Sequence, residues 1–177
     1  QALASIRAWA AEAGLPNLAD PIHLDVTQAE WPLERADALV NVNMIHISPW
    51  ETCLALLSGA ARVLAEGAPL YLYGPMIRAE RVTAASNLAF DRSLRDRDPS
   101  WGVRSVEAIT EAAALVGLAV ERVLDMPNNN TSLVLRKQGS SAGRRATSLI
   151  RRLATRSAGS TQSGKDASAT ARTSRAP

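Results

Sequence analysis

The sequence predicts an α/β fold in which helices and strands alternate and the chain closes with an antiparallel β-hairpin. Three observations predict this class. Apolar residues recur at helical spacing in some segments and alternate with polar residues in others. These two kinds of segment follow one another along the chain, which is typical of a mostly parallel sheet with helices on both faces. The last two extended segments are separated only by residues 127–130, so we expect them to pair with each other.

The first three elements are predicted from periodicity. Residues 2–13 place an apolar stripe on one side of a helix, which Gly14 ends. Residues 22–26 alternate between apolar and polar side chains, which predicts a strand. Residues 37–43 form the next predicted strand.

The second helix has the clearest start signal in the chain. Ser48 can cap the helix, Pro49 suits its first position, and Glu51 completes a capping box with Ser48. Apolar residues at helical spacing continue from there, so we expect the helix to run to Gly67.

The remaining elements alternate in the same way. They are a strand over 70–73, a helix over 86–97, a helix between 105 and 117, and strands over 120–126 and 131–136. Phe90 and Leu94 are expected to point inward from the first of these helices. Ser105 is expected to cap the second helix, and Gly117 to end it.

Charge divides the chain near residue 137. Residues 1–136 carry 11 basic against 16 acidic residues, a net charge of −5, whereas residues 137–177 carry 9 against 1, a net charge of +8. We therefore predict one α/β domain over 1–136 and a basic, low-complexity, disordered tail over 137–177, which has too few apolar residues to offset its chain entropy. Residues 144–155 have the pattern of a short basic amphipathic helix.

Composition also bears on partners and location. No run of residues is apolar enough to span a membrane, and no signal peptide opens the chain. The one cysteine, Cys53, excludes an intrachain disulfide and suits a reducing compartment, so we expect a cytoplasmic protein. Only the basic tail suits nucleic acid, and it lacks aromatic residues for stacking on bases, so a nucleic-acid partner is not expected. The sequence leaves the oligomeric state open.

Polar residues gather where the predicted strands end, and in such sheets ligands bind beyond the carboxyl ends of the strands. Asp25 can accept hydrogen bonds from an exocyclic amine or a ribose hydroxyl, or it can cap a turn. Asn41, Asn43 and His46 bring two amides and an imidazole together, which is costly without partners and favours a cleft. Gly74 permits a close approach of the backbone to a ligand.

Each of these residues also has a purely structural alternative. His46 is the candidate for acid–base chemistry because its ordinary pKa lies near neutrality, and its alternative is a histidine held by structural hydrogen bonds. Met44 and Trp50 can line a pocket or belong to the core. Residues 128–130 can do no more than form the hairpin turn.

Several catalytic centres are excluded by the sequence. The two histidines and one cysteine are not at zinc-ligand spacing, so no metal site is predicted. No Walker motif is present. Residues 139–143 match a nucleophile elbow, but no histidine follows them, as the hydrolase order requires. The only lysines are Lys137 and Lys165, so a Tyr-x-x-x-Lys pair is absent.

Four strings of residues occur in an order that is jointly specific. They are Asn-Met-Ile-His-Ile-Ser-Pro-Trp at 43–50, Tyr-Leu-Tyr-Gly-Pro at 71–75, a broken pattern over 86–104, and another over 126–134. Together they resemble the signature of a small methyltransferase-like family, domain of unknown function 938. The resemblance covers residues 1 to about 136.

The resemblance implies a Rossmann-like class I methyltransferase sheet that ends in an antiparallel hairpin and uses S-adenosylmethionine. It implies that Asp25 and Val26 flank the adenine and that Asn43 and Met44 lie near the methionine moiety. It further implies that His46, Trp50 and Tyr73 face the substrate side, with His46 as the candidate base, and that the acceptor is a small molecule.

The family pattern also begins with a strand, a glycine-rich loop, a helix and a second strand ending in an acid, and none of these is found here. We therefore expect an N-terminally incomplete chain without the cofactor loop. Three hypotheses follow: an incomplete methyltransferase, a fragment with no independent activity, and a non-catalytic relative that acts as a binding or interaction module.

Overall fold

The computed structural model describes residues 2–139 of the chain. Its elements, in chain order, are α1 (Ala2–Ala13), β1 (Leu39–Val42), η1 (Met44–His46), α2 (Trp50–Val63), β2 (Pro69–Pro75), α3 (Ala85–Arg97), α4 (Val106–Leu115), β3 (Leu118–Met126), η2 (Pro127–Asn129) and β4 (Asn130–Lys137). The predicted tail lies outside the described residues except for its first three positions, and so does the predicted basic helix over 144–155.

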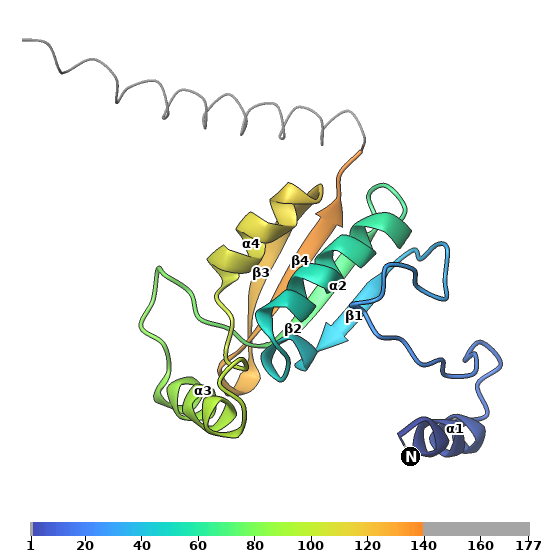
Figure 1. The fold of residues 1–177 in the computed structure, drawn as a ribbon, viewed down its shortest axis with the longest axis horizontal. Helices are drawn as coiled ribbons and strands as arrows, with labels where there is room; N and C mark the ends of the chain where they lie inside the picture. The colour runs from blue at the N-terminus through green and yellow to red at the C-terminus, as the bar shows by residue number, and fades with distance from the viewer. Residues whose placement is uncertain (1, 140–177) are drawn as a thin grey trace, which may run out of the picture.

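The strands form one four-stranded sheet in the order β1-β2-β4-β3 (Figure 1). β1 pairs with β2 in parallel, while β4 lies between β2 and β3 and is antiparallel to both. Three strands therefore run in one direction and only the last strand runs against them. The predicted hairpin is confirmed, with a bulge between Val120 and Arg122 in β3.

The core lies between the sheet and two helices. α2 and α4 lie side by side on one face of the sheet (Figure 1). Alternate residues of the central strands point toward them, because side chains of a strand alternate between its two faces. Leu70 and Leu72 of β2 are fully buried there, as are Leu133 and Leu135 of β4. They pack with Leu57 of α2 and Ile109 of α4, among others, in one apolar cluster.

The opposite face of the sheet is open in the described part of the chain. Val40 and Val42 of β1, which point away from α2, are 69% and 54% exposed. Their register partners Tyr71 and Tyr73 are half-buried. The expectation of helices on both faces is therefore not met within residues 2–139.

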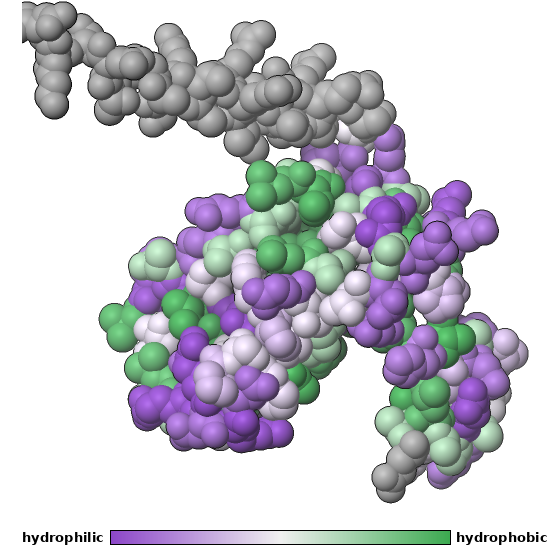
Figure 2. All heavy atoms as spheres, viewed as in Figure 1, coloured by the Kyte–Doolittle hydropathy of each residue, from purple (hydrophilic) through white to green (hydrophobic). Residues whose placement is uncertain are grey.

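The predicted first helix is present as α1, but it buries none of its residues. Figure 1 shows it apart from the sheet, and Figure 2 shows apolar residues on its surface. Trp9 is 69% exposed. Arg7 ties the helix to the loop that follows, through Asp20 at 3.5 Å.

The strand predicted over 22–26 is wrong. These residues have no strand pairing and Ile22 is 55% exposed. Alternation selects which side chains share a face, but a strand also needs a neighbouring backbone to receive its hydrogen bonds. Within the described residues, nothing pairs with the outer edge of β1, so the segment has no ladder to join.

Three details of the predicted helices are also wrong. The helix after Ser48 begins at Trp50 with Pro49 at its N-cap, because the Ser48 hydroxyl donates to the Met44 carbonyl oxygen at 2.8 Å instead of capping. The same helix ends at Val63 and not at Gly67. In α3, Leu94 is buried as predicted, whereas Phe90 is 39% exposed.

Candidate functional site

The carboxyl ends of β1 and β2 meet, and most of the predicted site residues gather there. The Asn43 N–H donates to the Tyr73 carbonyl oxygen at 2.9 Å, which joins the two strand ends directly. Asn43 has a φ of 61°, a left-handed conformation that few residues other than glycine adopt. Such conformations persist only where the surroundings hold them, and they concentrate at functional sites.

Met44 and Trp50 flank this turn from η1 and α2. Both side chains are half-buried and pack against the edge of the apolar cluster. Their position therefore agrees with both alternatives, lining a pocket and belonging to the core. Ile47, which lies between them in the sequence, is 44% exposed.

His46 is completely buried in η1. Its Nδ1 accepts a hydrogen bond from the Arg104 N–H at 3.3 Å, and its carbonyl oxygen accepts one from the Gly102 N–H at 3.0 Å. Its Nε2 is buried and has no hydrogen-bond partner among the described residues. Burial, with a further contribution from the Arg104 charge, lowers the pKa of His46 to about 4.

This geometry gives no support to His46 as a catalytic base. A base needs a free lone pair that the substrate can reach. The Nδ1 lone pair is already occupied by a backbone N–H, and Nε2 is shielded from solvent. The structural alternative for His46 fits these contacts better, and the base remains a prediction.

Arg104 is a site residue that the sequence did not point to. Its guanidinium donates to three carbonyl oxygens, those of Ile45 at 3.0 Å, Ser48 at 2.5 Å and Ser100 at 3.0 Å. It also lies over the ring of Trp50, 5.8 Å from the centroid. Burial lowers the pKa of Arg104 from its ordinary value. Arg104 thus holds η1 and the start of α2 to the segment before α4.

Gly74 explains how the two strand ends approach so closely. A Cβ atom at this position would lie 2.6 Å from Nε2 of His46 and 2.8 Å from Oδ1 of Asn43. Real Cβ atoms do not tolerate such contacts, so only glycine fits. The predicted close approach at Gly74 is real, and it is made by the protein's own side chains.

Tyr73 connects the site to the β3–β4 hairpin. Its hydroxyl accepts a hydrogen bond from Asn130 Nδ2 at 3.1 Å. The hydroxyl of Tyr71, two residues earlier on the same face, lies against Ser132 Oγ at 2.5 Å. The sequence predicts only a turn at Asn130, because no local signal reveals a contact that spans 57 residues.

Asp25 and Val26 lie in the loop before β1. Asp25 Oδ1 accepts hydrogen bonds from the backbone N–H of Thr27 at 2.9 Å and from its hydroxyl at 2.7 Å, which lower the pKa of Asp25. Val26 packs against the apolar cluster, and its carbonyl oxygen accepts from the Trp31 indole at 3.3 Å. No contact in the described residues joins Asp25 to Asn43 or Met44, so the structural alternative of a turn aspartate describes its contacts.

Two further observations concern the described residues only. No three side chains of His, Cys, Asp or Glu between residues 2 and 139 come together as metal ligands would. None of the helices in this range is both long and apolar enough to cross a membrane. Cys53 is free and fully buried, and burial raises its pKa to about 12.

Comparison with known proteins places the chain in a family. The model of the family described as "Protein of unknown function (DUF938)" matches residues 1–137, and the chain belongs to that family.

The fold is shared with solved methyltransferases. An O-methyltransferase family protein from Burkholderia thailandensis is 16% identical with a TM-score of 0.66, over 77% of this chain and 41% of that one. The mitomycin 7-O-methyltransferase MmcR is 20% identical with a TM-score of 0.64, over 76% and 39%. PigF, solved with SAH, is 18% identical with a TM-score of 0.64, over 77% and 40%. The chain has the Rossmann-like methyltransferase fold and spans about 40% of the length of each of these relatives.

Proposed function

We propose that this member of the DUF938 family forms one wall of the active site of a methyltransferase, which transfers a methyl group from S-adenosylmethionine to a small molecule. One observation carries the proposal. Asn43 is held in a left-handed conformation where β1 ends and is bonded to Tyr73 where β2 ends. This is the edge at which an α/β sheet binds its ligand, and the solved proteins that share the fold include O-methyltransferases.

The residues present fit one end of the proposed cofactor. Asn43 offers an exposed amide and Met44 a half-buried thioether at the strand end, which suit the amino-acid and sulfonium part of S-adenosylmethionine. Asp25 and Val26 do not offer the same for the adenine, because both oxygens of Asp25 are engaged by Thr27 and Gln28. We therefore assign the methionine moiety to Asn43 and Met44 and leave the adenosine without an assigned partner in this chain.

S-adenosylmethionine, when bound, supplies a methyl group on a sulfonium that an acceptor can displace directly. The chain's part in such a reaction is alignment, which by itself lowers a barrier substantially. Tyr73 and Trp50 would face the acceptor from two sides. Tyr73 is fixed through its hydroxyl by Asn130, and Trp50 is fixed under the Arg104 guanidinium. His46 would brace the turn that carries Asn43 and Met44.

The test compares the native protein that contains this sequence with the 177-residue chain alone. Calorimetry measures S-adenosylmethionine affinity for both, and labelled S-adenosylmethionine measures methyl transfer to a panel of phenols and carboxylic acids. We expect the native protein to bind and transfer, and Asn43→Ala to weaken binding at least tenfold. Asn17→Ala, in an exposed loop position, is the matched control.

The outcomes separate the hypotheses. Binding by the native protein but not by the chain supports a methyltransferase of which this chain is an incomplete part. A native protein that folds but binds no S-adenosylmethionine contradicts the proposal and favours the non-catalytic interaction module. We also propose a cytoplasmic location, which a single free and buried cysteine supports.

A further inference from the structure

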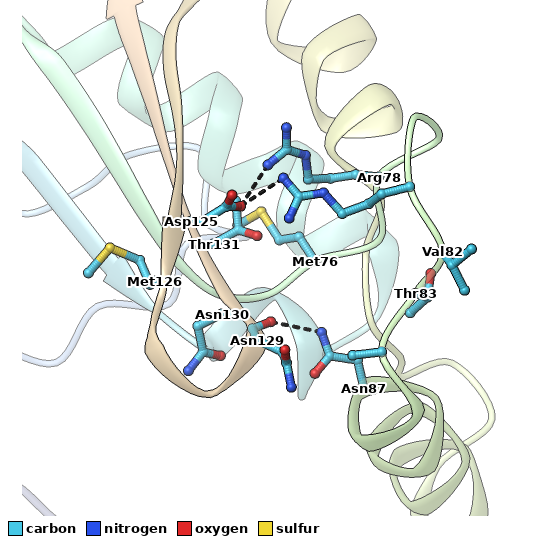
Figure 3. A pocket seen from close by; sticks show the side chains of 12 residues that line it. Met76, Arg78, Val82, Thr83, Asn87, Asp125, Met126, Asn129, Asn130 and Thr131 are labelled. Atoms are coloured by element: carbon cyan, nitrogen blue, oxygen red, sulfur yellow. Dashed lines mark hydrogen bonds and ion pairs between the residues drawn. The ribbon is translucent and has the colours of Figure 1, made fainter.

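A hollow lies beside the carboxyl end of β2. It is a cavity of about 270 Å³ between residues 76–84, the start of α3 and the β3–β4 hairpin (Figure 3). Small-molecule pockets usually measure roughly 300–1,000 Å³, so this cavity suits a compound of about one ring. The sequence predictions assigned nothing to it.

The charged residues that line the cavity are Arg78, Arg81 and Asp125, and both arginines also lie near Glu80, which is outside the lining. Arg78 Nη1 and Arg81 Nη2 both bind Oδ1 of Asp125, at 3.0 Å and 2.8 Å. Arg78 also pairs with Glu80, which lies within 4.0 Å of Arg81. Two guanidinium groups thus face two carboxylates. Arg78 is the more buried arginine, with 17% of its side chain exposed against 45% for Arg81.

The rest of the polar lining is uncharged. It consists of Thr83, Asn87, Asn129, Asn130 and Thr131. Figure 3 shows Arg78 and Asp125 at one end of the cavity and Asn87 facing Asn129 at the other. These amides and hydroxyls both donate and accept hydrogen bonds, and neither type carries charge.

The amides at that end are held in place. Asn87 is 7% exposed, and its Nδ2 donates to the Asn129 carbonyl oxygen at 2.9 Å. Asn129 Nδ2 donates to Ser86 Oγ at 3.0 Å. Asn128 and Asn129 both have a φ of 59°, a strained arrangement in two successive residues that these contacts stabilise. A wall fixed in this way is prepared for a ligand before the ligand arrives.

The cavity is connected to the strand ends through one residue. Asn130 lines the cavity and donates to the Tyr73 hydroxyl at 3.1 Å. The Tyr73 carbonyl oxygen accepts from Asn43, the residue assigned to the cofactor. Two hydrogen bonds through Tyr73 therefore join the wall of the cavity to Asn43.

We infer that the methyl acceptor extends from Tyr73 past Asn130 into this cavity, and that the part of it held there is uncharged and carries hydroxyl or amide groups. The inference depends on the proposed function only in calling the ligand a methyl acceptor. An anion in the cavity competes with Asp125 for the two guanidiniums, and a cation meets two arginines. An uncharged ligand leaves the ion pairs of Arg78 and Arg81 with Asp125 intact. It can form hydrogen bonds with the amides and hydroxyls of the lining. Asp125 thereby determines specificity, because it cancels the charge of Arg78 and Arg81.

The experiment uses three probes of one size that differ in charge: 4-hydroxybenzamide, 4-hydroxybenzoate and 4-hydroxybenzylamine. NMR titration of the 177-residue chain, without methyl donor, follows the backbone amides of Asn87, Asn129 and Thr131. We expect 4-hydroxybenzamide to bind at least fivefold more tightly than either charged probe. Asp125→Asn leaves two arginines opposite one carboxylate, so the ratio of affinities should shift at least tenfold toward 4-hydroxybenzoate.

Asp96→Asn is the matched control, since Asp96 is exposed on α3 and does not line the cavity. It should leave the ratio unchanged. Tightest binding of 4-hydroxybenzoate by the unaltered chain overturns the inference, as does an unshifted ratio in a folded Asp125→Asn chain or the absence of any perturbation at millimolar probe. If the cavity prefers 4-hydroxybenzamide but the native protein binds no S-adenosylmethionine, the proposed function fails and the charge preference survives.

Discussion

His46 and Gly74 occupy the same small space, and each restricts the other. The imidazole fits because Gly74 has no Cβ, and burial lowers the pKa of His46 so that the imidazole is uncharged near neutral pH. A buried imidazolium without a carboxylate partner would be costly. At the scale of single residues, the stability of the site is therefore sensitive to volume added at Gly74 and to protonation of His46.

Gly74→Ala tests the sensitivity to added volume. The added methyl group would lie 2.6 Å from His46 Nε2 and 2.8 Å from Asn43 Oδ1, so side chains or strand ends must shift. Overpacking of this kind costs about 1–3 kcal/mol, which urea unfolding at pH 7 measures. Gly139→Ala is the control, because the atom nearest to a Cβ at this position is a side-chain oxygen of Glu66 at 3.3 Å, farther than the contacts at Gly74. Equal stability of both variants would show that the contact at Gly74 is not tight.

The pH dependence of stability tests the sensitivity to protonation of His46. The pKa of His46 is about 4 in the folded chain against an ordinary value near 6.5, so the unfolded chain binds more protons between these values. Stability due to His46 is complete above about pH 6.5 and is lost as pH falls toward 4. We expect a loss of about 2 kcal/mol between pH 7 and pH 5.

Two substitutions test whether His46 causes this loss of stability. His46→Gln should remove this part of the pH dependence, whatever it does to stability at pH 7. His23→Gln, at the other histidine of the chain, should leave it in place, since His23 is exposed. A slope that survives in the His46 variant would mean that another group titrates.

The elements around the site depend on one side chain from far along the chain. Arg104 bonds η1, the turn at Ser48 and the segment at Ser100. A short 3₁₀ turn has few stabilising interactions of its own. Its position, and with it the position of Asn43 and Met44, therefore depends on this guanidinium.

Arg104→Lys keeps the charge but loses the planar set of donors that reaches three carbonyl oxygens. We expect a loss of about 2–3 kcal/mol in urea unfolding, together with a changed indole NMR signal of Trp50. Arg97→Lys is the control, because Arg97 also lies over a ring, that of Trp101 at 5.1 Å, on the exposed side of α3. A Trp50 signal that does not move would contradict the role of Arg104 in positioning this segment.

Comparison of Ser105 with Ser48 shows which elements a sequence predicts well. Ser105 caps α4 as predicted, accepting from the Ala108 N–H at 3.1 Å. Ser48 had the fuller local motif, yet its hydroxyl donates to Met44 because η1 brings that carbonyl oxygen within reach. Local signals predict that a helix begins, and tertiary neighbours decide which group caps it.

The same distinction applies to the site. That Asn43, Met44, Trp50 and Tyr73 lie near one edge of the sheet was predictable, because the carboxyl ends of neighbouring parallel strands meet whatever the details of packing, while the roles of these residues stay predictions. Arg104 was not predictable, since it reaches its partners across more than 50 residues of sequence. Residues 22–26 had the right alternation, but pairing partners are not a property of the segment itself.

At the scale of the whole molecule, the two faces of the sheet differ in burial. Leu72 is fully buried against the helices, whereas Val40 on the opposite face is 69% exposed. The described part of the chain is thus a sheet covered on one side. Its stability comes from the layer formed with α2 and α4.

Truncation of one residue on each face tests this asymmetry. Leu72→Ala should cost about 2–5 kcal/mol, because it removes buried methyl groups and leaves a cavity. Val40→Ala should cost less than about 1 kcal/mol, because little apolar surface is buried there. Urea unfolding measures both. A large cost at Val40 would mean that residues outside 2–139 cover the open face.

The place of β4 in the sheet has a consequence for how the protein is made. β4 is the last strand of the sheet in the chain, yet it lies between β2 and β3. Until Lys137 has been synthesised, β2 has a neighbour on one edge only. At roughly 5–20 residues per second, the interval between Pro75 and Lys137 lasts several seconds on the ribosome. For that time the nascent chain exposes one unpaired edge of β2, which makes it a client for chaperones that hold such segments during translation.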